Sequence, residues 1–258
     1  MTRQILAWTG VGVLAAWLYG PDVMPGVSAQ TRFYLPSSST TTIAPSVTSV
    51  WSHTVGVALE RREMRIEATS TELALLAYSP DAADHLTSGS SLFVQFYSAS
   101  ALAAQTIPSQ LVDMSIQGSE TNGGNNVSLT ARLFVVSGGG TTIRGQLFAQ
   151  VKALTELSTT NFSNRLFQTT TELTVQQGDR LVFEVGIAGV PTAAGGLQGH
   201  NGRLRFGDPD GDTDLPETET ESGLGFRPWI ELANTLTFET AGAATSVVAK
   251  RLLLLGVG

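Results

Sequence analysis

The chain has no cysteine and little charge, and each shortage excludes a class of protein. Without cysteine it has no disulfide framework, no zinc–thiolate site and no catalytic thiol. Charged residues make up only 14% of the 258 residues, too few for a coiled coil. The three histidines, His53, His85 and His200, lie far apart, and none falls in an HExxH zinc motif. Because 22 acidic residues outnumber 15 basic ones, the chain also lacks the basic excess expected of a nucleic-acid-binding protein.

The chain does have a hydrophobic content of 42% and 27 glycines. This length and composition are sufficient for one large domain, which we place at residues 31–240. Apolar and polar residues alternate in short segments separated by Gly, Ser, Thr and Pro. The clearest segments are Ser91–Ser98, Leu111–Gln117, Val127–Val136 and Arg180–Gly189. A period of two with one apolar face is what two packed sheets require, so we predict an all-β fold, a β-sandwich of the jelly-roll type.

Other stretches of this domain are less regular. Weaker strands are predicted at Thr31–Leu35, Arg203–Phe206, Trp229–Leu232 and Thr235–Phe238. In Met64–Ser79, apolar residues follow neither the helical nor the strand spacing without interruption. Ala99–Ala104 has room for one helical turn, and Gln146–Leu157 fits either a helix or a strand. We expect Trp51 and Trp229 to lie in the interior, with a sugar-stacking platform as the alternative.

Both ends of the chain are apolar. In residues 1–30, a charge-free stretch runs from Ile5 to Tyr19 and small residues end at Ala29. Three interpretations stay open for this segment: a retained arm packed on a partner, a secretory signal peptide, or a membrane anchor, for which the stretch is short. Residues 241–258 contain four consecutive leucines and form either an apolar tail or a final strand. The predicted assembly contacts are Ile5, Leu6, Trp8, Leu14, Trp17, Leu252, Leu253, Leu254 and Leu255.

The negative charge is concentrated in one predicted loop, Asp208–Glu221. It carries seven acidic residues and no basic one, which accounts for the whole net charge of −7. Its acidic residues alternate at the oxygen-rich spacing of calcium loops, although Gly211 is misplaced for an EF-hand. The loop is therefore a Ca²⁺ site, a solvated tip or an acidic docking surface. The candidate ligands are Asp208, Asp210, Asp212, Asp214 and Glu219.

No catalytic motif is recognisable. The chain has no GxSxG elbow, no P-loop and no GxGxxG after a strand. Jelly-roll glycosidases use two carboxylates, and Glu184 and Glu231 are the strand acids to consider. Each alternates with apolar neighbours, so we interpret both as solvent-facing and predict that the protein is not an enzyme.

Five segments of the chain form a recognisable set of strand and turn patterns: Thr31–Ser38 with the following Trp51, Leu102–Ile107, Gln177–Gly186, Leu204–Pro216 and Arg227–Leu232. Together they resemble a family of tailed-bacteriophage virion structural proteins. The resemblance implies a β-rich, non-enzymatic subunit of a virus particle that decorates the head or belongs to the neck, tail or fibre. It also implies other virion proteins and further copies of the chain as partners, and the virion as location, without catalytic residues.

The alternative function is a secreted carbohydrate-binding or adhesion module. On that hypothesis residues 1–29 are the signal peptide, and a glycan is the ligand. Neither hypothesis requires a cofactor beyond calcium in the acidic loop, a nucleic acid or a membrane span.

Overall fold

The computed structural model is built from β-strands throughout the part of the chain that it describes. That part comprises residues 30–37, 43, 50–54, 60–68, 71–78, 89–121, 123, 126–160, 162–189, 201–208, 213–223 and 225–239. Sixteen strands and no helix occur in it. The prediction of an all-β fold is confirmed, while the jelly-roll topology stays a prediction.

Sheet A has six strands in the order β1-β16-β7-β13-β4, with β10 pairing β7 off this path. The strand β7 is its centre: β10 pairs along most of its length, whereas β16 and β13 pair with its first and second halves. All of these pairs are antiparallel. The strands are β1 Thr31–Tyr34, β4 Thr71–Tyr78, β7 Leu111–Glu120, β10 Phe162–Thr169, β13 Gly202–Asp208 and β16 Trp229–Leu232.

Sheet B also has six strands, in the order β2-β5-β12-β8-β9, with β3 pairing β5. The short strands β2 and β3 run parallel to β5, and the other pairs are antiparallel. The strands are β2 His53–Thr54, β3 Glu60–Met64, β5 Ser90–Ser98, β8 Val127–Val136, β9 Ile143–Glu156 and β12 Arg180–Gly189. Two small two-stranded sheets complete the described part: β6 Gln105–Ile107 with β11 Leu173–Val175, and β14 Thr213–Asp214 with β15 Phe226–Arg227.

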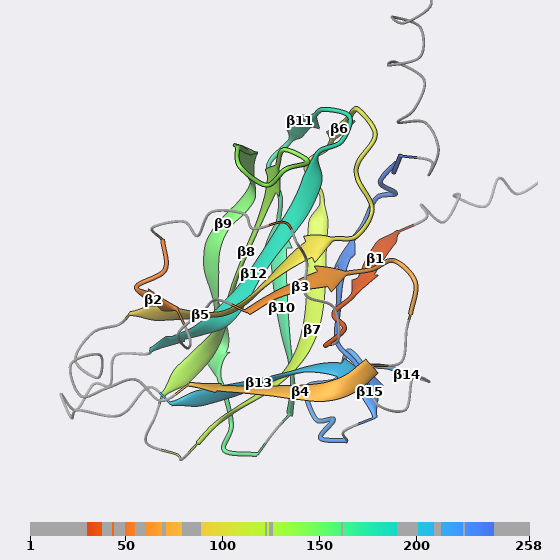
Figure 1. The fold of residues 1–258 in the computed structure, drawn as a ribbon. Coiled ribbons are helices and arrows are strands. Elements are labelled where there is room, and N and C mark those ends of the chain that lie inside the picture. Colours follow the sequence, from red (N-terminus) through yellow and green to blue (C-terminus); the bar gives the residue numbers. More distant parts are fainter. Residues whose placement is uncertain are drawn as a thin grey trace, which may run out of the picture.

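The two large sheets pack on one another, with sheet B drawn in front of β7 and β10 in Figure 1. Their inner faces supply one continuous hydrophobic core. The rings of Phe96 in sheet B and Phe206 in sheet A lie 5.1 Å apart between centroids, which joins the layers edge to face. Trp51 and Trp229 are buried, as predicted, with exposed fractions of 6% and 1%.

Some local predictions were wrong or are now decided. Gln146–Leu157 lies almost wholly in β9, so it forms a strand and not a helix. Thr235–Phe238 is not a strand; only Phe238 makes an isolated bridge, to Leu102. Met64–Ser79 contains the last residue of β3 and the whole of β4.

Other predictions fall on residues outside the described part. These residues include His85, His200 and every predicted assembly contact in residues 1–29 and 240–258. Among the described residues, no helix has the length and hydropathy needed to cross a membrane.

Candidate functional site

Around Glu184, the outer face of sheet B is polar yet buried. On β12, Phe183 and Val185 point into the core, so the intervening Glu184 points to the opposite face. There it has an exposed fraction of 0%, and its neighbour Arg132 on β8 has one of 5%. Part of the cover is Trp51, which precedes β2. The prediction that Glu184 faces solvent was wrong, because strand alternation cannot reveal a segment folded over the outer face.

Glu184 is held by two hydrogen-bond donors and one cation. The indole Nε1 of Trp51 donates to Oε2 at 2.7 Å, and the amide Nε2 of Gln95 donates to Oε1 at 2.9 Å. The Arg132 Nη1 lies 3.9 Å from Oε2. A buried carboxylate requires such compensation, because removing it from water costs several kcal/mol, about 3–5 kcal/mol when one partner of a pair is missing.

Arg132 is itself fixed on the opposite side of its guanidinium. Its Nε and Nη2 donate to Oε1 of Gln146 at 3.1 and 2.8 Å. Burial lowers the pKa of Arg132, and the negative charge of Glu184 partly opposes that shift. The pair thus forms a rigid polar network under Trp51.

A hollow of about 330 Å³ lies beside this network on the same face of sheet B. It is lined by Val50, Ser52, Ser90, Thr130, Gln150, Val151, Lys152 and Ala188. Hydroxyl, amide and ammonium groups therefore dominate its wall. Lys152 is the one charged side chain among these lining residues.

Hydrogen bonds hold the wall of the hollow in place. The Ser52 N donates to the Ser90 carbonyl at 2.9 Å, and the Ser90 N donates back to the Ser52 Oγ at 3.2 Å. The Gln150 Nε2 donates to the Ser90 Oγ at 3.0 Å. The Lys152 Nζ donates to the Gly189 carbonyl at 3.1 Å, one of the three bonds an ammonium can make.

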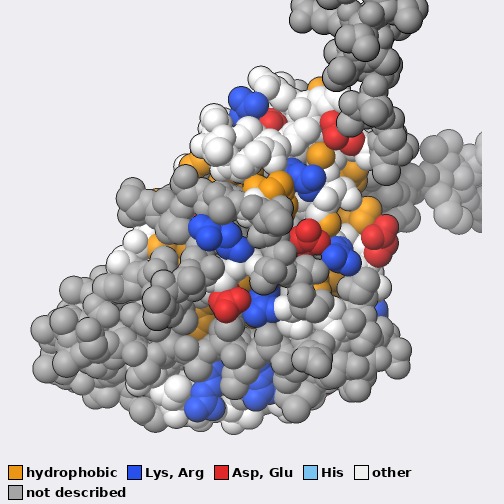
Figure 2. Space-filling model, viewed as in Figure 1, with side chains coloured by type: hydrophobic (Ala, Val, Ile, Leu, Met, Phe, Trp, Pro, Cys, Tyr) orange, Lys and Arg blue, Asp and Glu red, His pale blue; other side chains and the backbone are white. Residues whose placement is uncertain are grey.

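The outer face of sheet A is different, because it carries ion pairs that water reaches. The Arg32 Nη1 lies 2.6 Å from the Asp214 Oδ2, and its Nε lies 2.7 Å from the Glu231 Oε2. Arg227 contributes a second cation, 3.0 Å from the Asp214 Oδ1. Figure 2, viewed from the side on which sheet B lies in front, shows acidic and basic side chains on that side as well. Glu231 thus points outward as predicted, but it is paired.

The acidic segment also contacts sheet A near Arg165. The Arg165 Nη2 pairs with Asp113 and lies 3.3 Å from the Glu217 Oε2. The backbone N of Arg165 donates to the Glu219 Oε1 at 3.0 Å. The carboxylates of the segment therefore bind arginines and backbone of the chain's own sheet.

These contacts bear on the predicted calcium ligands. Asp214 and Glu219 have protein partners, and the two do not share one. Asp208 ends β13 with its side chain undescribed, and Asp210 and Asp212 lie outside the described residues. Within the described ranges, no group of three or more His, Asp or Glu side chains is placed to hold a metal ion.

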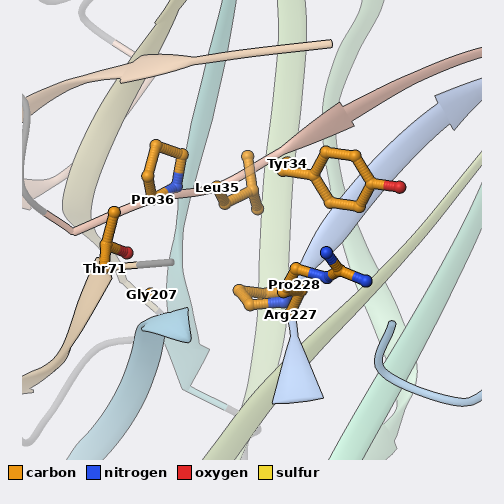
Figure 3. A pocket seen from close by; sticks show the side chains of 7 residues that line it. All are labelled: Tyr34, Leu35, Pro36, Thr71, Gly207, Arg227 and Pro228. Carbon is orange, nitrogen blue, oxygen red and sulfur yellow. The ribbon is translucent and has the colours of Figure 1, made fainter. Parts of the chain in front are cut away.

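A smaller cavity lies where β1 ends, near β13 (Figure 3). Its volume is about 10 Å³, room for about one water molecule. The Arg227 guanidinium closes one side, 5.2 Å from the centre of the Tyr34 ring. Gly207 has a positive φ of 84°, and its backbone lies against that of Leu35. The Gly207 N donates to the Leu35 carbonyl at 3.0 Å. This volume is far below the roughly 300 Å³ at which small-molecule sites begin.

Two further hollows lie at the edges of the sandwich. One of about 380 Å³ lies between β9 and β10, where Leu154 and Phe167 are exposed. The other, of about 370 Å³, lies beside β1 and Phe238. Both have mainly apolar walls, unlike the hollow on sheet B.

Sequence reasoning did not find the residues of the sheet B hollow. They come from five separate stretches of the chain, which include Ser52, Ser90 and Lys152. One signal was available, since Lys152 is one of only two lysines in the chain.

Comparisons with known proteins give no family. No family model and no curated protein matches the chain. A CocE/NonD family hydrolase from Staphylococcus aureus matches with a TM-score of 0.41 and 10% identity, over 81% of this chain and 37% of that one. An alpha-amino acid ester hydrolase matches with a TM-score of 0.40 and 11% identity, over 81% of this chain and 36% of that one. The chain thus spans just over a third of these hydrolases, and likeness at this level assigns it no activity.

The comparisons also correct a prediction. The structure of infectious bursal disease virus Gx strain matches with a TM-score of only 0.15 and 9% identity, over 73% of this chain and 51% of that one. Because the better-matching structures are hydrolases, the prediction of a non-enzymatic virion subunit is contradicted, and we do not retain it. The segments that suggested it are strand and turn patterns, which sandwiches of unrelated function share.

Proposed function

We propose that the hollow on sheet B binds a small polar molecule that carries a carboxylate or phosphate group. The observation that carries the proposal is the single ammonium group of Lys152 in a hollow of about 330 Å³ with hydroxyl and amide walls. Ligand sites commonly measure about 300–1,000 Å³, so this volume favours a small ligand.

The charge of the wall favours an anion. Lys152 uses one N–H for the Gly189 carbonyl, and its other N–H groups are not bonded to described residues. The nearby Arg132 and Glu184 are committed to each other and to their own partners. The hollow therefore carries one net positive charge from its lining, and a charge-assisted bond to a bound anion is the strongest contact it can offer.

The wall is also pre-organised. Trp51 is anchored to Glu184, and the next residue, Ser52, is tied to Ser90 by two hydrogen bonds. A wall that is already ordered loses little conformational entropy when a ligand binds.

Titration calorimetry with malonate, inorganic phosphate and glycerol tests the proposal. We expect malonate or phosphate to bind and neutral glycerol not to bind. Lys152→Met should weaken anion binding at least about tenfold, the value of one charge-assisted hydrogen bond. The control is Arg203→Met, which removes an exposed cation from the outer side of sheet A and should leave affinity unchanged. Equal affinity of Lys152→Met and wild type, or no binding of either anion, would contradict the proposal.

A further inference from the structure

An apolar groove lies along one side of the sandwich, where the edge strands of the two sheets meet. Within the described residues, β9 pairs only with β8, and β10 pairs only with β7. The two edge strands contact each other, but among the described residues no strand pairing joins them. The hollow of about 380 Å³ lies between residues 151–155 of β9 and residues 165–168 of β10. We call this hollow the edge groove.

A bulge in β9 turns an apolar side chain outward at this groove. Between the register pairs Ser128–Glu156 and Thr130–Lys152, one residue of β8 faces three residues of β9. Such extra residues bend an edge strand and redirect its side chains. Leu154 is the middle one of the three, and its exposed fraction is 104%. The strand therefore presents a leucine entirely to water.

β10 presents a second large apolar side chain at the same place. Leu166 belongs to the core, so strand alternation turns Phe167 away from it. Phe167 has an exposed fraction of 51%, and the Arg165 guanidinium lies 4.2 Å from the centre of its ring. Both Leu154 and Phe167 line the edge groove. Exposed apolar side chains gathered around a hollow are typical of a contact surface.

The surroundings of the edge groove carry an excess of negative charge. Charged side chains line the groove, pair with its arginine or follow it along β9. They are the four carboxylates of Asp113, Glu156, Glu217 and Glu219 and the two cations of Lys152 and Arg165. The carboxylates therefore outnumber the cations by two, and Glu217 has 64% of its side chain exposed. An occupant that fits this groove has apolar side chains and about two positive charges.

We propose that the edge groove binds the C-terminal segment Lys250–Leu255 of the same molecule. This segment, which lies outside the described residues, consists of a lysine, an arginine and four consecutive leucines. Its leucines fit the apolar wall, and its two cations fit the excess of two carboxylates. The inference goes beyond the function proposed for sheet B, because Leu154, Phe167 and Glu217 do not line that hollow.

The length of chain after the described part favours binding within one molecule. The described part ends at Glu239, whose N donates to the Ala101 carbonyl at 2.9 Å. The stretch from Glu239 to Lys250 spans up to about 36–40 Å when extended. A domain of this size has a radius of gyration of about 16 Å, so this reach is comparable with its width. A short tether also gives an effective concentration of about 1 mM, which favours the chain's own segment over a second copy.

Disulfide cross-linking of the full chain tests the proposal, because the chain has no cysteine of its own. Thr155→Cys puts a thiol at the groove and Gly256→Cys puts one directly after the leucines, and neither removes an apolar side chain. With oxidised glutathione, we expect this double variant to form a disulfide within one chain, located by peptide mass spectrometry. The control combines Gly256→Cys with Ile66→Cys, since Ile66 is an exposed apolar residue outside the groove. It should cross-link at least about tenfold more slowly, because the bound segment is held elsewhere.

Further substitutions in the Thr155→Cys, Gly256→Cys background separate the apolar contact from the charge contact. Leu253→Ser with Leu254→Ser should slow cross-linking at least about tenfold, because two leucines no longer leave water. Lys250→Glu should slow it about two- to fivefold, the range of an exposed ion pair. Adding Glu217→Lys to Lys250→Glu should restore the rate, since the two charges are then exchanged.

Four results would overturn the proposal. The first is equal cross-linking rates for the thiols at positions 155 and 66. The second is a rate that the change of Leu253 and Leu254 leaves the same. The third is a Glu217→Lys variant that does not restore the rate lost in Lys250→Glu. The fourth is a cross-link found only between chains, which would assign the groove to a second copy.

Discussion

The outer faces of the two sheets both carry charged side chains, and these charges are compensated in different ways. Over the outer face of sheet A, Asp214 of β14 lies between Arg32 and Arg227, with about a quarter of its side chain exposed to water. On sheet B, Glu184 is shut from water and depends on Trp51, Gln95 and Arg132. The difference teaches that a charged residue on the outer side of a strand costs little free energy of folding only while water solvates it. Once another segment covers the residue, hydrogen bonds and an opposite charge must replace that water.

The largest expected effect is the loss of the Glu184 carboxylate. Glu184→Ala leaves the buried Arg132 charge and two donors without an acceptor, so we expect a loss of about 3–5 kcal/mol in the free energy of unfolding. Urea unfolding measures it. The control on sheet A is Glu231→Ala, where we expect about 1 kcal/mol or less. Equal losses at the two positions would remove the distinction between the faces.

The next largest expected effect is a difference in stability loss between variants of the two interior tryptophans. Trp51 donates its indole N–H to a charged acceptor, Glu184, whereas Trp229 donates to the Leu215 carbonyl at 2.8 Å. Hydrogen bonds to charged groups contribute about 1.5–3 kcal/mol, against about 0.5–1.5 kcal/mol for neutral ones. Trp51→Phe should therefore destabilise by about 1 kcal/mol more than Trp229→Phe. A larger loss for Trp229→Phe in parallel urea titrations would contradict this ranking.

The smallest expected effect concerns the ion pairs of sheet A and their dependence on salt. Asp214→Asn weakens the contacts to Arg32 and Arg227, and we expect a loss of about 0.5–1 kcal/mol at low salt. In 0.5 M NaCl the loss should shrink, because salt screens exposed charges beyond about 4 Å at that strength. The cost of Glu184→Ala should stay the same in both salts. A salt-independent Asp214→Asn would show that this network is buried in solution.

The alternation of residues was enough to predict much of the sandwich. Trp229–Leu232 and Val127–Val136 are strands with the predicted bounds, and Leu181, Phe183 and Val185 face the core as predicted. Their apolar face must be buried whatever the rest of the chain does. The prediction of a virion subunit was wrong because the same pattern serves proteins of any function.

The candidate sites could not be predicted in the same way. The sheet B hollow needs Ser52, Ser90 and Lys152 together, although they are far apart in the chain. The spacing of these residues in the sequence does not predict that they meet.

By itself, the sequence determined that the chain folds into β-strands with a shared apolar core, and that its excess negative charge lies in one segment, Asp208–Glu221. Only the tertiary structure decided which charges meet. It placed Arg32, Arg165 and Arg227 against that segment and covered Glu184 with Trp51. The physical reason is that strand alternation is a local steric property, whereas the partner of a charge depends on which distant segments the packing of the two sheets brings together.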